Sequence, residues 1–66
     1  MALSEAQKML LEYLKSIQVG EERAIAIMIA VKEPNQTDKL IDYIVDNQKT
    51  ITSSQILHKA LEISQE

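Results

Sequence analysis

The sequence contains no cysteine, tryptophan or phenylalanine, and its 66 residues include one glycine, one proline and one histidine. Without cysteine no disulfide can form, and a single histidine gives no basis for a Cys/His metal site. A chain of this length buries only about 60% of the surface that its unfolded form exposes, so small domains usually need a further source of stability. Contact with a partner chain is the remaining ordinary source, and we expect no metal or other cofactor.

Charge and hydropathy argue against two further classes of function. Seven Lys and Arg residues against ten Asp and Glu residues give a net charge of -3, which disfavours nonspecific binding to nucleic acid or to an anionic membrane. The apolar run from Ala24 to Val31 is far shorter than the ~20 residues that a membrane-spanning helix needs. The first residues lack the basic region of a signal peptide, and the absence of cysteine fits a reducing compartment. We therefore expect a cytoplasmic protein without a membrane segment.

The same apolar run raises the question of strand or helix. Residues 23–34 read RAIAIMIAVKEP, in which isoleucine alternates with alanine and methionine as in a β-strand. Alanine and methionine are good helix formers, however, and no second β-like run exists to pair with this one. We therefore predict a helix that Pro34 ends, apolar almost all round and so central, with neighbours on several sides.

Three further helices are predicted from capping signals and from apolar residues at three- and four-residue spacing. The first begins at a capping box over residues 4–7, and Gly20 is expected to cap its end in the left-handed conformation. The third takes Asn35 as its N-cap, and the fourth opens with a second capping box over residues 52–55. The sequence thus predicts a single all-α domain over residues 1–66, a bundle of four short helices at about 5–18, 21–33, 36–47 and 53–64 with the second helix central.

Three aspartates repeat at every fourth position of the predicted third helix. Asp38, Asp42 and Asp46 therefore form an acidic ridge that faces away from the apolar stripe. A solvated surface explains such a ridge, and docking of a basic partner surface is the alternative. His58, the single histidine, has no nearby partners for a metal or acid–base site and is expected to be a solvated helix residue.

Residues 40–64 read LIDYIVDNQKTITSSQILHKALEIS, which is an apolar helix, a short polar turn and a Thr/Ser-capped helix. This stretch resembles the opening of helix-turn-helix and winged-helix domains, and the resemblance implies DNA binding by residues 38–64. In such domains a recognition helix follows, whereas only Gln65 and Glu66 remain in this sequence after Ser64. If the fourth helix itself reads DNA, the contacts are expected from Lys49, Thr52, Ser53, Ser54, Gln55, His58 and Lys59.

The sequence shows no convergent polar cluster, and so short a chain can hardly bury a substrate. We therefore predict a non-enzymatic protein that acts through protein–protein contact, as a regulatory or accessory factor of a microbe or phage; the alternative is a helix-turn-helix-like DNA-binding regulator. The apolar outliers Met9, Leu11 and Val19 fit none of the predicted stripes, so one bundle leaves apolar surface uncovered. We expect this surface to be covered in a two-fold homodimer, with another protein as a further possible partner.

Overall fold

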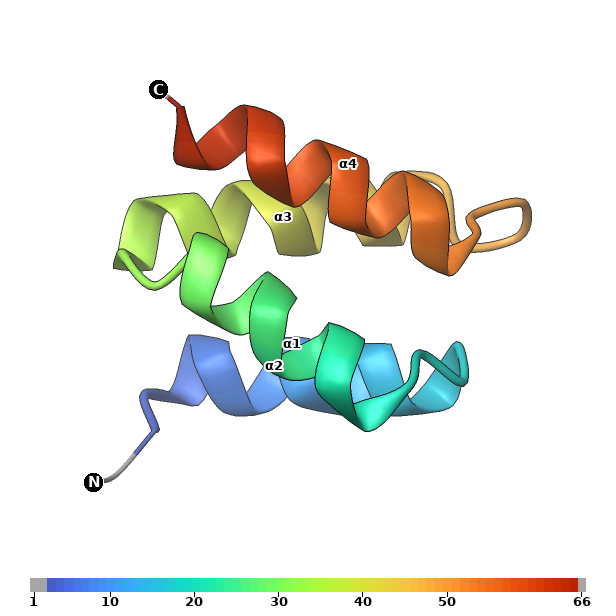
Figure 1. The fold of residues 1–66 in the computed structure, drawn as a ribbon, viewed down its shortest axis with the longest axis horizontal. Coiled ribbons are helices and arrows are strands. Elements are labelled where there is room, and N and C mark those ends of the chain that lie inside the picture. Colours follow the sequence, from blue (N-terminus) through green and yellow to red (C-terminus); the bar gives the residue numbers. More distant parts are fainter. Residues whose placement is uncertain (1–2, 66) are drawn as a thin grey trace.

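A computed structural model gives the fold of the protein and describes residues 3–65. Its elements are four helices, and the described residues contain no strand. This confirms the predicted all-α fold class and the number and order of the helices (Figure 1). The bounds are α1 (Glu5–Ser16), α2 (Glu21–Ala30), α3 (Pro34–Asp46) and α4 (Ser53–Ser64).

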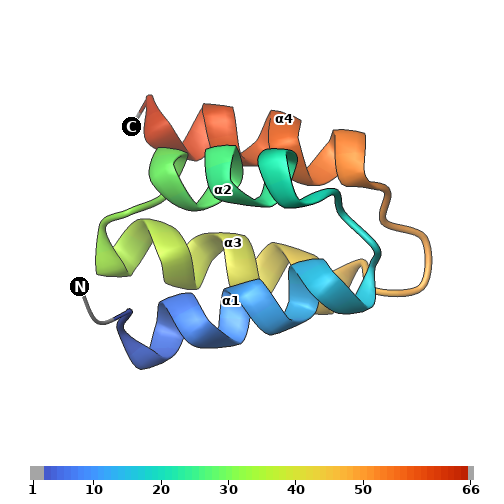
Figure 2. The same cartoon turned by 60° about the horizontal axis from the view of Figure 1, so that its bottom comes forward.

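The four helices form a closed ring of contacts. α1 packs on α3, α3 on α4, α4 on α2, and α2 on α1. Figures 1 and 2 show that α1 and α3 run in one direction while α2 and α4 run in the other. Each helix has two main neighbours in this ring, and α2 and α3 are not neighbours. The connection from α2 to α3 therefore crosses the bundle diagonally.

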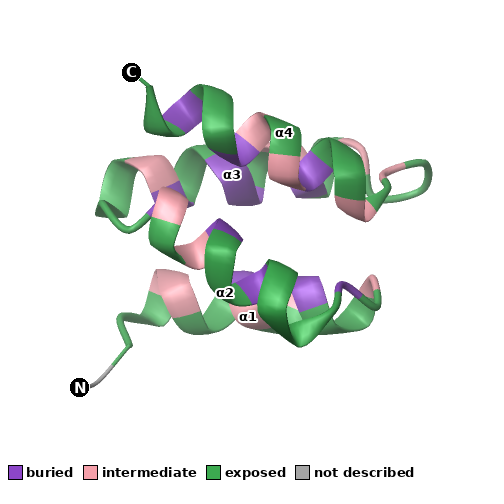
Figure 3. Cartoon of the chain, in the orientation of Figure 1, coloured by how far each residue is buried: buried purple, intermediate pink, exposed green. Residues whose placement is uncertain are grey.

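The prediction that α2 is the central helix is wrong, as the burial of its side chains shows. Only Ala24 and Ile27 of this helix are buried, while Ile25 and Ile29 are exposed. A ring of four helices leaves every member one outer face, so none of the four can be central (Figure 3). We therefore expect a charged residue at position 29 to leave the core of this chain intact.

The core fills the space inside the ring. Every helix contributes side chains to it, and α3 contributes the largest number of buried residues. No buried side-chain nitrogen or oxygen atom within residues 3–65 lacks a hydrogen-bond partner. The fully buried apolar side chains of largest volume are Leu10, Leu14, Ile27, Val31, Leu40, Ile44 and Ile56.

The turn after α1 differs from the prediction, because Gln18 and not Gly20 has the left-handed conformation. Gln18 has a φ of 66°, whereas Gly20 has a φ of -60° and is the N-cap of α2. The amide of Gln18 donates to the carbonyl of Lys15 at 3.0 Å, and that of Val19 donates to Leu14 at 3.0 Å, which is the hydrogen-bond pattern of a Schellman motif. This motif places an apolar residue just after the left-handed one, so burial of Val19 against the core fixes the turn at Gln18.

The start of α3 also differs from the prediction. Glu33 and not Asn35 is the N-cap, and Pro34 is the first helical residue. The proline ring fixes φ near the helical value, and its missing N–H is no loss in the first turn. The proline that was expected to end α2 therefore begins α3. α2 itself ends at Ala30, three residues before the predicted end.

Thr37 joins the end of α2 to the start of α3. Its side chain is completely buried. The hydroxyl lies within hydrogen-bond distance of the carbonyl of Val31, which follows α2, and at 3.0 Å from the carbonyl of Glu33. Val31 therefore keeps a partner for its carbonyl although it lies in the core.

We expect Thr37→Val to lower the free energy of unfolding by about 1–3 kcal/mol, because the buried carbonyl of Val31 then loses the hydroxyl that donates to it. Thr37→Ser is the control, since it keeps the hydroxyl and loses one methyl group. Urea unfolding followed by circular dichroism measures both variants. A valine variant that is as stable as the wild type would contradict the assigned role of the hydroxyl.

Candidate interaction surface

A groove of about 890 Å³ lies between α1 and α2 on the outer side of the bundle. Hereafter it is called the α1–α2 groove. Most of its lining is apolar, and the polar or charged lining residues are Gln7, Lys15, Glu21 and Lys32. The apolar lining residues are Leu3, Leu11, Val19, Ala24, Ile25, Met28 and Ile29.

The residues of α1 and α2 that line this groove follow from helix geometry. On α1 the lining residues Gln7, Leu11 and Lys15 are four positions apart and so form one ridge. On α2 the ridge of Ile25 and Ile29 forms the opposite wall. The two walls are antiparallel because the chain reverses direction in the turn at Gln18.

Ile25 and Ile29 are the notable feature of this surface. Their side chains are 52% and 67% exposed, the two highest values among the large apolar side chains that are exposed in residues 3–65. Full burial of an isoleucine is worth about 1.5–3 kcal/mol relative to exposure. Ile25 and Ile29 therefore leave apolar surface in water, and its burial against a partner would stabilise a complex.

Two of the three apolar outliers in the sequence lie in this groove. Leu11 is half-buried and Val19 is buried, and both belong to the lining. Met9 is 51% exposed and does not line the groove. The outliers thus indicated that uncovered apolar surface exists, but they did not indicate that α2 contributes the larger part of it.

The acidic ridge is present on the surface of α3. Asp38, Asp42 and Asp46 are all exposed and lie on one helix at four-residue spacing. None of the three lines the α1–α2 groove. The acidic ridge and the uncovered apolar surface, both of which the sequence suggested for partner contacts, therefore lie on different parts of the molecule.

Several residues of the DNA-binding alternative already have structural roles. Thr52 and Gln55 form the predicted capping box, with the Thr52 amide donating to Gln55 Oε1 at 2.8 Å and the Gln55 amide donating to Thr52 Oγ1 at 3.3 Å. Arg23 Nη1 donates to Ser53 Oγ at 2.8 Å, a link between the starts of α2 and α4 that the sequence did not reveal. These contacts hold the start of α4 in place.

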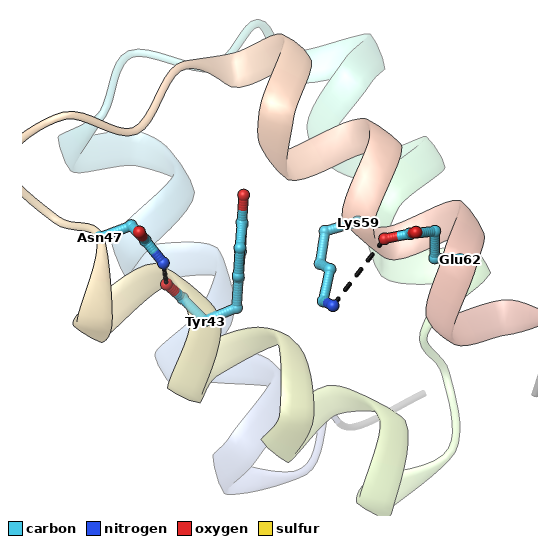
Figure 4. Close-up of polar contacts among 4 residues, drawn as sticks. All are labelled: Tyr43, Asn47, Lys59 and Glu62. Carbon is cyan, nitrogen blue, oxygen red and sulfur yellow. Dashed lines mark hydrogen bonds and ion pairs between the residues drawn. The ribbon is translucent and has the colours of Figure 1, made fainter.

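Lys59 is also engaged within the chain. Its Nζ lies 3.8 Å from Glu62 Oε2 and 5.4 Å from the centre of the Tyr43 ring (Figure 4). On the other side of Tyr43, Asn47 Nδ2 donates to the Tyr43 carbonyl at 2.9 Å and so caps the end of α3. The structure brings Ser54, Gln55, His58 and Lys59 together in a depression beside Tyr43 and Glu62.

Lys49 lies apart from that depression, on the exposed turn between α3 and α4. Along this hairpin α3 and α4 run beside each other in opposite directions (Figures 1 and 2). Helices of a helix-turn-helix motif instead meet at about 90–120°. The arrangement of α3 and α4 thus differs from a helix-turn-helix pair in which α4 is the reading helix.

Comparisons with protein-family models, curated proteins and solved structures found no match to this chain. Within residues 3–65, no three His, Cys, Asp or Glu side chains come together as a possible metal site. None of the four helices has the length and hydropathy to cross a membrane. The geometry of the chain itself is therefore the basis for the functional argument.

Proposed function

We propose that this protein acts through protein–protein contact at the α1–α2 groove and catalyses no reaction, as a regulatory or accessory factor in the cytoplasm. The observation that carries the proposal is the exposure of Ile25 and Ile29 beside an apolar groove. Contiguous exposed apolar surface on a small protein is typical of an interaction site. The cytoplasmic location rests on the absence of cysteine, which fits a reducing compartment.

The polar residues of the groove support binding and not catalysis. Gln7, Lys15, Glu21 and Lys32 are spread along two helices and their flanking turns. A catalytic site needs groups that converge on one reacting atom with an orienting partner for each. Charged residues around an apolar patch are instead the usual rim of a protein interface.

A photo-reactive amino acid placed at position 29 tests the proposal in cells that express the protein. We expect irradiation to cross-link this position to a protein, either a second copy of the chain or a different protein. The matched control is position 45 on α3, because Val45 is also a branched apolar residue and is 46% exposed. Absence of a protein adduct at position 29, or equal yields at both positions, would contradict the proposal.

Amide spectra recorded with duplex DNA at low and at moderate salt test the competing DNA-binding function. If α4 reads DNA, the shifts that persist at moderate salt appear at Lys49, Ser54 and His58. We expect no shift that survives moderate salt, because the chain is acidic and few cations lie near α4. Salt-resistant shifts at these positions would favour the DNA-binding regulator over the protein-binding function.

A further inference from the structure

The exposed side of α2 has a charge pattern that is complementary to itself. Glu22, Ile25, Ile29 and Lys32 are separated by three, four and three residues. Glu22, Ile25 and Ile29 lie on α2 at the spacing of a coiled-coil seam. Lys32 lies beyond the C-cap of α2, where it lines the same groove as the two isoleucines, so the two ends of this row have opposite charges. The order of the intervals is the same from either end, so two antiparallel copies place these positions opposite one another.

All four positions are accessible in the folded chain. Glu22 and Lys32 are exposed like the two isoleucines between them, and Lys32 is the second residue after Ala30, the last residue of α2. Within residues 3–65 neither Glu22 nor Lys32 has an ion-pair partner. Both charges are thus available for a contact with another chain.

We propose that two copies of the chain form a two-fold homodimer in which their α2 helices pack antiparallel over the α1–α2 groove. The two-fold axis passes at the level of Ile27. Ile25 of each copy therefore faces Ile29 of the other copy. Glu22 then faces Lys32 of the second copy at both ends of the contact. This inference rests on the proposed function and names its partner as a second copy of this chain.

The charges select the antiparallel arrangement. In a parallel pair the two copies of Glu22 would face each other, and so would the two copies of Lys32. Like charges across a helix seam disfavour an arrangement, whereas opposite charges set the orientation of the partners. The antiparallel pair forms two attractive contacts in place of two repulsive ones, and it also aligns the helix dipoles favourably.

The groove provides room for the second copy. Met28 lies on the groove side of α2 and Leu11 on the facing side of α1, and both are only half-buried. An α2 helix that contacts Ile25 and Ile29 also covers this part of the groove. The dimer thus removes from water the apolar surface that α1 and α2 leave uncovered at this groove.

Sedimentation equilibrium of the whole chain tests the proposal with two single charge reversals and their mixture. The wild type is expected near twice the 7.5 kDa chain mass at tens of micromolar. In Glu22→Lys each copy brings two lysines to the seam, and in Lys32→Glu each copy brings two glutamates. Each variant alone is therefore expected to dissociate with a dissociation constant raised by about tenfold or more.

An equimolar mixture of the two charge-reversal variants restores both ion pairs in a heterodimer. We expect its mass to return to the dimer value, which an interface that does not involve these charges does not produce. The single variants exclude a parallel pairing, because a parallel pair already places like charges together at both ends in the wild type and neither reversal would weaken it further. Ile29→Asp should abolish the dimer, and its circular dichroism spectrum and melting should remain those of a folded chain because position 29 is exposed.

A wild type that sediments as a monomer, or a mixture that stays as dissociated as its components, would overturn the homodimer. The cross-linking experiment at position 29 separates this outcome from failure of the proposed function. If position 29 cross-links to a different protein while the wild type is monomeric, the proposed function is supported. The proposal that the partner is a second copy of this chain is then wrong. If position 29 gives no protein adduct, the proposed function fails as well.

Discussion

Ile44→Asp is expected to unfold the protein. Ile44 lies on α3 with its side chain completely buried in the core. A chain of this size has roughly 3–10 kcal/mol of stability, and an unpaired carboxylate in an apolar core costs several kcal/mol. Loss of helical circular dichroism and of a cooperative melt is the expected result.

The neighbouring residue provides a matched control for this substitution. Val45 is also β-branched and lies on the same helix, but it is 46% exposed. Val45→Asp should therefore change the free energy of unfolding by less than about 1 kcal/mol, as is usual for surface positions. If Ile44→Asp keeps a native spectrum, or if both variants unfold, the assigned inner face of α3 is wrong.

Leu40→Ala is expected to lower the free energy of unfolding by about 2–5 kcal/mol. Leu40 is completely buried on α3, where it belongs to the same core cluster as residues of all four helices. The truncation removes apolar contacts and leaves a cavity that the bundle can fill only in part. For a domain of this size, 1 kcal/mol corresponds to about 4–8 °C in melting temperature.

Thermal melts of Leu40→Ala and Leu61→Ala at equal protein concentration check this expectation. Leu61 carries the same side chain on α4 but is 47% exposed. A large fall in melting temperature is expected for position 40 and a small one for position 61. Equal falls for the two variants would show that burial does not distinguish these leucines.

The helix starts that depend on neighbouring residues alone could be predicted from the sequence. Both predicted capping boxes are present, since Gln7 and Gln55 each exchange hydrogen bonds with the residue three positions earlier. Such contacts span one turn and need no tertiary structure. The start of α4 at Ser53 is accordingly correct to the residue.

The turns were less predictable because tertiary burial decides between local alternatives. Glycine favours the left-handed conformation in general, but burial of Val19 places it at Gln18. The role of Thr37 depends on the carbonyl of Val31, which comes within reach only when the chain turns after α2. A sequence pattern does not contain that geometry.

The orientation of α2 was the largest uncertainty for the site. A helix that is apolar nearly all round shows no stripe that would indicate which side faces the core. Only the packing of α1 and α4 against it decides that Ile27 is buried while Ile25 and Ile29 are exposed. The sequence therefore predicted surplus apolar surface and a homodimer, but not the helix that carries the proposed contact.

The methyl spectrum of the wild type recorded over a dilution series tests the proposed contact most directly. The account predicts concentration-dependent shifts for the methyl groups of Ile25, Met28 and Ile29, because dilution returns them from the interface to water. The methyl groups of Val45 and Leu61, which are exposed on other helices, should not shift. Methyl positions on α2 that stay constant over the whole series, or shifts confined to α3 and α4, would contradict association through the α1–α2 groove.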